Sequence, residues 1–331
     1  MSFKQNQHAI FRFVEPDLTI PAYDRAIFAN PRPKRLEQLE LPLHDFRTST
    51  EVARGFEGLD QQGFTYIEHA SSLTPDEMLA GRNAEDKLAP EVLEMMAKLT
   101  GAKRGVVHSI GFRRIPASKQ QDLDFVPMRG SEIDQQMEQI PKDGMLVNGR
   151  HEQSASEPAR QCHVDTTLEG LRRTLQFSNT EIAEAAKNIM DAEALRKASH
   201  DVEVPRYAAY SVWRPLKTVK RDPIAVADYR TLDPDDLVAT ENRIPSGINA
   251  EGDYIIEAYT GRPPKQPVKQ KWYWVPEQKP NEVLIIKFAD SAAETDPSIA
   301  ACGLHASPVL PGTEEEEVRQ SSEVRVYMFW E

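Results

Sequence analysis

The stretch Gln161-Cys162-His163-Val164-Asp165-Thr166 is the centre around which the predicted fold and site are organised. In an extended strand, residues i and i+2 point to the same face, so His163 and Asp165 present an imidazole and a carboxylate side by side. Such a pair, joined by one distant histidine, is the two-histidine, one-carboxylate triad that holds non-haem Fe(II) and leaves one side open for a co-substrate and dioxygen. A His-x-Asp pair alone is more often a hydrogen-bonded pair than a metal site. The rest of the sequence must therefore show which of the two it is.

The distant histidine that we expect in the triad is His305, which lies in a predicted break between strands at 303–308. The alternative for His305 alone is a loop histidine that makes one hydrogen bond. A triad that spans a barrel requires a third ligand far along the chain, and His305 meets this requirement. We therefore predict that His163, Asp165 and His305 are the metal ligands and the catalytic centre.

The last predicted strand favours the metal site, because its alternation places several polar side chains on one face. Two arginines on one face are costly unless an anion or carboxylate meets them. Arg319-x-Ser321 after a distal histidine predicts a grip on the distal carboxylate of 2-oxoglutarate, with two hydrogen bonds from the guanidinium and one from the hydroxyl. Arg325 is the competing anchor, and a Glu323–Arg325 ion pair on a solvated strand is the alternative. The shared face comprises Arg319, Ser321, Glu323, Arg325 and Tyr327.

A third cluster lies at 210–216, where Ser211 and Trp213 would face one side of a strand and Arg214 the other. Tryptophan at such a position is more often part of the core than a platform for a ligand. Ser211, Trp213 and Arg214 are candidate substrate-binding residues.

The composition is that of an ordinary globular protein: 331 residues, 40% hydrophobic and 28% charged. The net charge of −12 argues against nucleic acid or an anionic membrane as the main partner. Cys162 and Cys302 are too few for a disulfide framework, and we expect free thiols. No apolar run reaches membrane-spanning length and no targeting signal is evident, so a cytoplasmic protein is expected. A homodimer is compatible with these features.

The pattern along the chain predicts a mainly β protein with flanking helices, built on a double-stranded β-helix (a jelly-roll, cupin-like core). We expect an N-terminal α/β cap at 1–117, a lid or insertion loop at 118–160 and a jelly-roll catalytic core at 161–331, all in one structural domain. Within the cap, 15–50 is expected to wrap the surface as an arm. Helices are expected after a capping box at 74–77, from 90 to a stop at Gly101, and after a capping box at 178–181. Strands are expected at 9–14, 63–68, 105–110, 207–213, 224–228, 254–259, 272–275, 283–288 and 324–330.

From about residue 50 to its end, the chain resembles the hydroxylase/desaturase family that includes fungal gibberellin desaturase and the bacterial cephamycin methoxylation protein. The chain departs from the family pattern at Ser211, where an asparagine is usual, and near Pro308, where an aromatic residue is usual. It rests on several motifs in the same order: His163-x-Asp165, Ser211–Leu216, Asp222–Asp228, Lys287–Ser291, Leu304–Ser307 and Arg319–Arg325.

The resemblance implies an enzyme of class EC 1.14.11, a dioxygenase that uses Fe(II), 2-oxoglutarate and dioxygen in specialised metabolism. Such an enzyme hydroxylates, desaturates or oxidatively cyclises a hydrophobic terpenoid, polyketide or peptide-derived small molecule by ferryl hydrogen-atom abstraction. One alternative is a non-oxidative zinc enzyme on the same ligands, although it would have no need of Arg319-x-Ser321. The other alternative is a non-catalytic partner subunit that retains the barrel fold.

Overall fold

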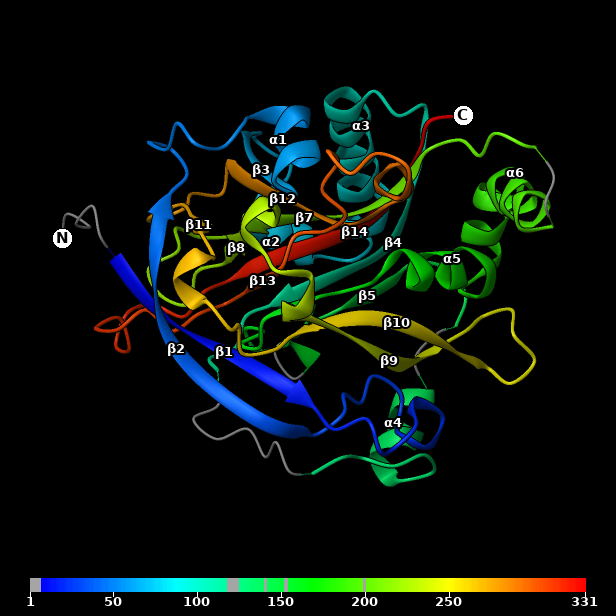
Figure 1. Cartoon of the computed structure of the whole chain (residues 1–331), viewed down its shortest axis with the longest axis horizontal. Helices are drawn as coiled ribbons and strands as arrows, with labels where there is room; N and C mark the ends of the chain where they lie inside the picture. The colour runs from blue at the N-terminus through cyan, green and yellow to red at the C-terminus, as the bar shows by residue number, and fades with distance from the viewer. Residues whose placement is uncertain (1–6, 118–124, 140–141, 152–153, 199–200) are drawn as a thin grey trace.

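The computed structural model describes residues 7–117, 125–139, 142–151, 154–198 and 201–331, and two facing sheets form its centre (Figure 1). The pairs β2–β11 and β4–β5 are parallel and all other neighbours are antiparallel. The first sheet has the order β1 (Gln7–Pro16), β2 (Pro33–Asp45), β11 (Trp272–Trp274), β8 (Ala225–Ala227), β13 (His305–Ala306), β6 (His163–Val164), β10 (Asp253–Gly261) and β9 (Leu237–Pro245). The second has the order β3 (Phe64–Glu68), β12 (Glu282–Asp290), β7 (Tyr207–Pro215), β14 (Ser321–Phe329), β4 (Arg104–Arg113) and β5 (Leu146–Asn148).

The second sheet is buried on both faces, and the alternation of its strands decides what each face meets. On β7 and β14, Trp213 and Tyr327 belong to the core cluster between the two sheets, together with Trp272 of the first sheet. Their neighbours Val212 and Val324 belong instead to the cluster under the N-terminal helices. Two mainly antiparallel sheets that face each other across a core are the jelly-roll architecture that the sequence predicts.

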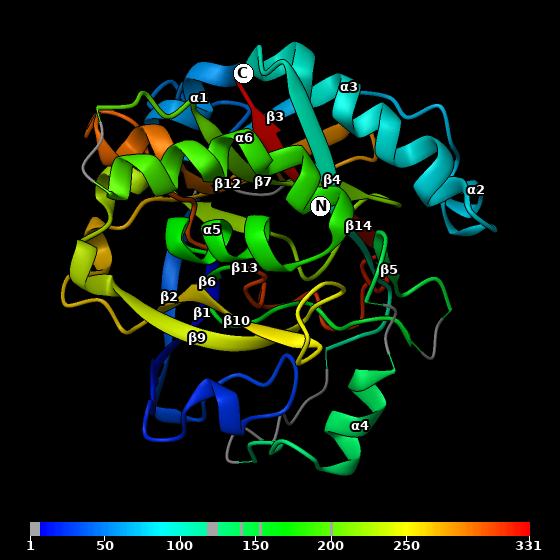
Figure 2. The same cartoon turned by 90° about the vertical axis from the view of Figure 1, so that its right-hand side faces the viewer.

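Helices cover the outer face of the second sheet and one open side between the sheets (Figures 1 and 2). Thr74 and Glu77 form the predicted capping box, and Gly101 ends the next helix with a φ of 72°. The helices are α1 (Gly55–Gln61), α2 (Pro75–Leu79), α3 (Ala89–Thr100), α4 (Glu132–Glu138), α5 (Leu168–Phe177) and α6 (Thr180–Lys197). Short 3-10 or π turns lie at Ala22–Asp24, Ala84–Leu88, Tyr229–Thr231, Pro234–Asp236, Pro267–Lys269 and Ser291–Glu294.

The structure corrects several expectations. Residues 15–50 are not only an arm, since β2 lies within them and pairs along β1. The segment 1–117 is not only a cap, because β1 and β2 belong to the first sheet and β3 and β4 to the second. Strand β9 and helix α5 were not expected. Asn179, rather than Ser178, caps α6 by accepting a hydrogen bond from the Ile182 backbone N–H.

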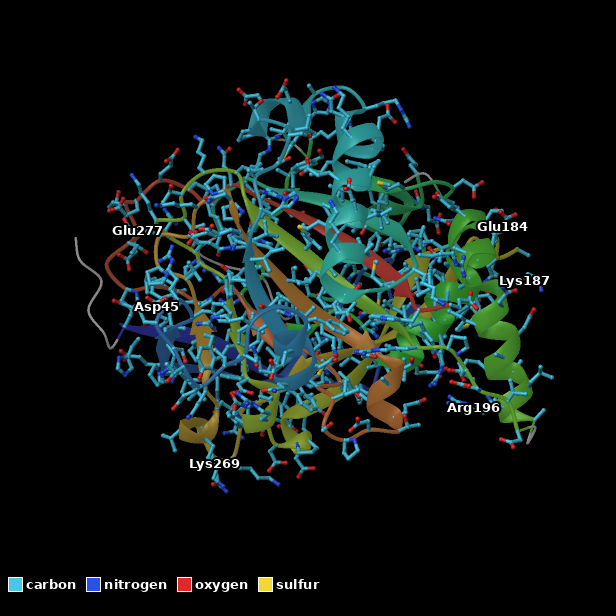
Figure 3. All side chains as sticks on the ribbon, turned by 90° about the horizontal axis from the view of Figure 1, so that it is seen from above. Asp45, Glu184, Lys187, Arg196, Lys269 and Glu277 are labelled. Carbon is cyan, nitrogen blue, oxygen red and sulfur yellow. The ribbon has the colours of Figure 1, made fainter. Side chains whose placement is uncertain are left out.

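The predicted lid at 118–160 contains α4 and β5, while 118–124, 140–141 and 152–153 lie outside the described residues. Helix α4 lies beyond β9 and β10 in both views (Figures 1 and 2). On the other side of the molecule, Glu184, Lys187 and Arg196 of α6 point outward (Figure 3), and all three are exposed. Among the described residues, no helix is long and apolar enough to cross a membrane.

Candidate metal centre and adjoining pockets

His163, Asp165 and His305 come together at the point where β6 pairs with β13, with His163 directly opposite His305. The Nε2 atoms of the two histidines lie 3.2 Å and 3.5 Å from Oδ1 of Asp165. One nitrogen or oxygen from each residue lies within 4.8 Å of the others. The strand pairing therefore assembles the three side chains that the sequence singles out.

The two histidines are held in the tautomer that a metal requires. Nδ1 of His163 lies 2.7 Å from the carbonyl oxygen of Gln161, and Nδ1 of His305 lies 3.0 Å from that of Gly303. Because a carbonyl only accepts, each Nδ1 carries the proton and each Nε2 keeps its lone pair free. Histidines that bind metals are oriented in the same way in known sites.

Asp165 offers one oxygen to this centre and gives the other to Arg325. Nε of Arg325 donates to Oδ2 of Asp165 at 2.7 Å, and Nη2 lies 2.6 Å from the same oxygen in the ion pair. Oδ1 is buried and has no hydrogen-bond partner among the described residues. A buried carboxylate oxygen without a donor is costly, and a metal ion would satisfy it together with the two Nε2 atoms. The residues present therefore fit a metal of the Fe(II) type.

The pKa values of the three groups follow from their surroundings. Burial opposes protonation of His163, but its contact with Asp165 and the charge of that carboxylate outweigh burial and raise its pKa. Burial and the neighbouring His163 lower the pKa of His305 to about 4. Burial opposes ionisation of Asp165, but the charge of Arg325 and the contact with His163 hold its pKa well below the usual range. At neutral pH, Asp165 is thus an anion and His305 is neutral, which are the forms that bind metals.

Next to His163 and His305 is a narrow pocket into which Arg319, Trp213 and Ser307 also face. Arg319 is 3% exposed, and its Nη1 donates to the carbonyl of Asp222 at 2.7 Å and to Oγ of Ser307 at 3.1 Å. Nε of Arg319, Nε1 of Trp213 and Oγ of Ser321 are buried and have no partner among the described residues. Arg319 and Trp213 line the pocket, whereas Ser321 of β14 is not among its lining residues. Unpaired polar groups that face one pocket are typical of a polar ligand site.

The other predicted side chains are divided between two faces. Ser211 is buried and donates to Glu323, and Glu323 accepts from Arg325, so these side chains form a chain that leads to Asp165. Trp213 faces the narrow pocket. Arg214 does not reach either pocket, because it points to the other face of β7 and donates to the carbonyls of His69 and Pro280. Arg214 therefore lies away from both the narrow pocket and the groove described below.

On the open side of His163 and Asp165 is a groove of about 730 Å³, a volume in the range of small-molecule sites. It receives Phe125 and Arg160 from the predicted lid and Phe28 from the segment between β1 and β2, and Tyr259 comes from β10. Trp213 does not line this groove, which differs from the expectation that it could form the substrate pocket.

The sequence did not reveal Arg113, the last residue of β4, which lines both the narrow pocket and the groove. Its only signal is its place beside Arg114 at the end of a predicted strand. The two cysteines are both free and buried, as expected.

Comparisons with known proteins agree with this architecture. The family model described as Oxidoreductase/YMDC permease-like domain matches residues 32–329. The gibberellin cluster GA4 desaturase of Gibberella fujikuroi is 33% identical over 82% of this chain and 82% of its own length. The alpha-ketoglutarate-dependent dioxygenase phiK of a fungal species is 25% identical over 86% and 83%, and the hydroxylase/desaturase CTB9 of Cercospora beticola is 28% identical over 82% and 72%. A solved structure of the iron and alpha-ketoglutarate-dependent endoperoxidase NvfI has a TM-score of 0.62 at 22% identity and covers 99% of both chains, which shows the likeness of fold.

Proposed function

The chain belongs to the Oxidoreductase/YMDC permease-like family, and its relatives include a desaturase, a hydroxylase/desaturase and an alpha-ketoglutarate-dependent dioxygenase. From this premise we propose how its own residues perform such chemistry. The protein is an oxidoreductase that uses Fe(II), 2-oxoglutarate and dioxygen on a small molecule. His163, Asp165 and His305 hold the iron. The observation that supports this assignment is the convergence of two free Nε2 atoms on an unpartnered, buried carboxylate oxygen.

Arg319 and Ser321 bind the distal carboxylate of 2-oxoglutarate. The unpaired Nε of Arg319 and Oγ of Ser321 support this role, since a carboxylate would satisfy both. Arg325 is not the anchor, because its guanidinium is already used by Asp165 and Glu323.

When bound, Fe(II) and 2-oxoglutarate supply the oxidising chemistry, in which dioxygen is activated, the co-substrate leaves as succinate and carbon dioxide, and an unactivated C–H bond loses hydrogen. The contribution of the chain is to place the reacting groups. The carbonyls of Gln161 and Gly303 fix the two imidazoles, and Arg325 fixes the carboxylate. Trp213, Ile224 and Ile286 line the narrow pocket beside Arg319 and would shield a bound co-substrate from water.

The groove binds the organic substrate. Phe28, Phe125 and Tyr259 offer apolar surface there, which supports a hydrophobic specialised metabolite of the terpenoid, polyketide or peptide-derived kind. We propose hydroxylation, desaturation or oxidative ring closure as the outcome. A cytoplasmic location, a homodimeric assembly and the absence of nucleic-acid or membrane partners remain predictions from the sequence.

The first test needs no substrate. Fe(II) and then 2-oxoglutarate are added to the purified protein without oxygen, and the weak visible metal-to-ligand charge-transfer band is recorded. We expect the band in the wild-type protein and its loss in Asp165→Ala, which removes the shared oxygen ligand. Arg47→Gln, which removes a surface guanidinium paired with Glu282, is the control and should keep the band.

The rival functions give other results. If Fe(II) binds but 2-oxoglutarate produces no band, the co-substrate assignment fails and a non-oxidative zinc enzyme on the same ligands becomes the better description. If no divalent metal binds, the triad assignment itself is wrong and a non-catalytic partner subunit is favoured.

A further inference from the structure

Two guanidinium groups face the narrow pocket without a direct ion pair to a carboxylate of the described residues. Arg319 and Arg113 both line this pocket. In the part of the chain that the structure describes, neither forms an ion pair; Arg319 donates to a carbonyl and a hydroxyl, and Arg113 donates to the carbonyl of Glu157. Burial, and next the charge of Arg113, lower the pKa of Arg319 to about 9. The two like charges therefore oppose each other inside the protein.

The nearby acidic groups are already used by other arginines. Asp222 is shared between Arg160 and Arg221. Asp165 and Glu323 both bind Arg325. Asp222 and Glu323 therefore act on Arg319 only through their charge, and neither forms an ion pair with Arg319 or Arg113 among the described residues. A ligand with two negative charges would neutralise both arginines.

The position of Arg113 indicates which part of such a ligand it meets. Arg113 is directly opposite Ser321 in the pairing of β4 with β14, so the two side chains share the inner face. Among the residues described, only Arg113, Ala159 and His163 line both the narrow pocket and the groove. Arg113 is thus at the junction on the side of His163, whereas Arg319 lies deeper, against Trp213.

We infer that Arg113 is a second co-substrate-binding residue, which contacts the carboxylate of the 2-oxo acid end while Arg319 binds the distal carboxylate. This inference rests on the proposed function. The two arginines then match the two carboxylates of one dicarboxylate, and the excess positive charge of the pocket selects for a dianion. Hydrogen bonds between charged groups are the strong ones, so each guanidinium contributes to the affinity.

The test is an anaerobic titration of the Fe(II)-loaded protein with 2-oxoglutarate, followed by the charge-transfer band. Arg113→Gln should weaken 2-oxoglutarate binding by about 10- to 100-fold, as expected for the loss of a hydrogen bond between charged groups. It should also shift the band to higher energy, because a positive charge beside the 2-oxo acid lowers the energy of the acceptor orbital. Arg319→Gln should weaken binding without moving the band. Arg113→Lys, which keeps the charge, should retain more affinity than Arg113→Gln and also covers the case in which the glutamine variant fails to fold.

Arg114→Gln is the matched control, because it removes the same charge one residue away. Arg114 donates to the carbonyls of Gly149 and Arg150 and lines neither pocket, so its loss should leave affinity and band unchanged. An unchanged affinity in Arg113→Gln would overturn the inference and assign Arg113 to the organic substrate. A weaker affinity with an unmoved band would overturn its assignment to the 2-oxo acid end. If the wild-type protein itself shows no band, the proposed function fails, which separates the two conclusions.

Discussion

At the scale of single residues, Arg325 differs from the other arginines of the site because its guanidinium binds the carboxylate of Asp165, which faces the proposed metal position. It binds Oδ2 of Asp165 through two nitrogens, so only Oδ1 is left for an ion. Glu323 contacts Arg325 at 3.2 Å and is itself bound by Ser211. We therefore infer that Arg325 positions the carboxylate of Asp165, whereas the sequence alone offered it as the competing anchor for the co-substrate.

We expect Arg325→Gln to reduce Fe(II) affinity by about 10- to 100-fold, as for other residues that orient metal ligands. Arg325→Lys should recover part of this loss, since it restores a charge but not both hydrogen bonds. The measurement is an anaerobic metal titration, with thermal unfolding to verify the fold. Normal metal affinity combined with weak 2-oxoglutarate binding would instead return Arg325 to the role of an anchor.

Arg319 is expected to act on the co-substrate and not on the metal. Arg319→Gln should weaken 2-oxoglutarate binding by about 2–5 kcal/mol, the cost of truncating a buried charge pair. Fe(II) affinity should stay within a few-fold of the wild type, because Arg319 contacts none of the three metal ligands in any hydrogen bond or ion pair. Equal losses for metal and co-substrate would argue that the substitution disturbs the whole site.

At the scale of elements, α4 is attached to the first sheet by a buried ion pair. Asp134 and Arg243 of β9 are 0% and 1% exposed at their side chains and lie 2.9 Å apart. Asp134 also accepts from the backbone N–H groups of Ile27 and Gly130, and Arg243 binds Asp253 of β10. This arrangement fixes α4 on the segment that follows Phe125 and Pro127, two residues that line the groove.

Asp134→Asn should lower the free energy of unfolding by about 1.5–3 kcal/mol, the usual contribution of a hydrogen bond to a charged group. Glu138→Gln is the matched control, because Glu138 lies on the same helix and binds the same arginine but is 45% exposed. It should change stability by less than about 1 kcal/mol. Denaturant unfolding measures both, and equal effects would contradict the role of the buried pair.

The stabilisation by Asp134 should depend on pH. Burial opposes its ionisation, but the N–H groups of Gly130 and Ile27 and the charge of Arg243 keep its pKa below the usual value of 3.8. A carboxylate with a lowered pKa stabilises the folded state fully above its unfolded pKa and loses this effect as pH falls through the folded one. The stability difference between wild type and Asp134→Asn should therefore be constant near neutrality and shrink below about pH 3.8.

At the scale of the whole molecule, the site joins the two sheets. The proposed metal ligands come from β6, the residue that follows it and the neighbouring β13, while Arg319, Ser321 and Arg325 come from β14 or the residues just before it. A metal and a co-substrate would thus connect strands that otherwise contact each other only through side chains. Removal of the bound metal and co-substrate should therefore weaken the packing between the two sheets.

We expect Fe(II) with 2-oxoglutarate to raise the melting temperature without oxygen, and a chelator to reverse the rise. Binding at 100 times the dissociation constant stabilises a folded protein by about 2.7 kcal/mol. The effect should be absent in Asp165→Ala. An equal rise in that variant would mean that the ligands bind elsewhere.

The sequence by itself determined the features that depend on local spacing. The alternation around His163 and Asp165 and along 319–327 predicts which side chains share a face, since a strand has a period of two. The capping box at Thr74 and the glycine stop at Gly101 are equally local. The family, and with it the class of chemistry, also followed from motifs that can be read in order along the chain.

Only the tertiary structure decided which faces meet. That Arg325 lies on Asp165, that Arg113 lies beside Ser321 and that Arg214 points away from the site all depend on pairing or packing between segments far apart in sequence. Strands β2 and β9 were missed because their burial pattern is set by partners and not by their own composition. Strand register depends on residues far apart in the sequence, so it cannot be read from the local alternation of side chains. In this protein, the register determines which group each arginine contacts.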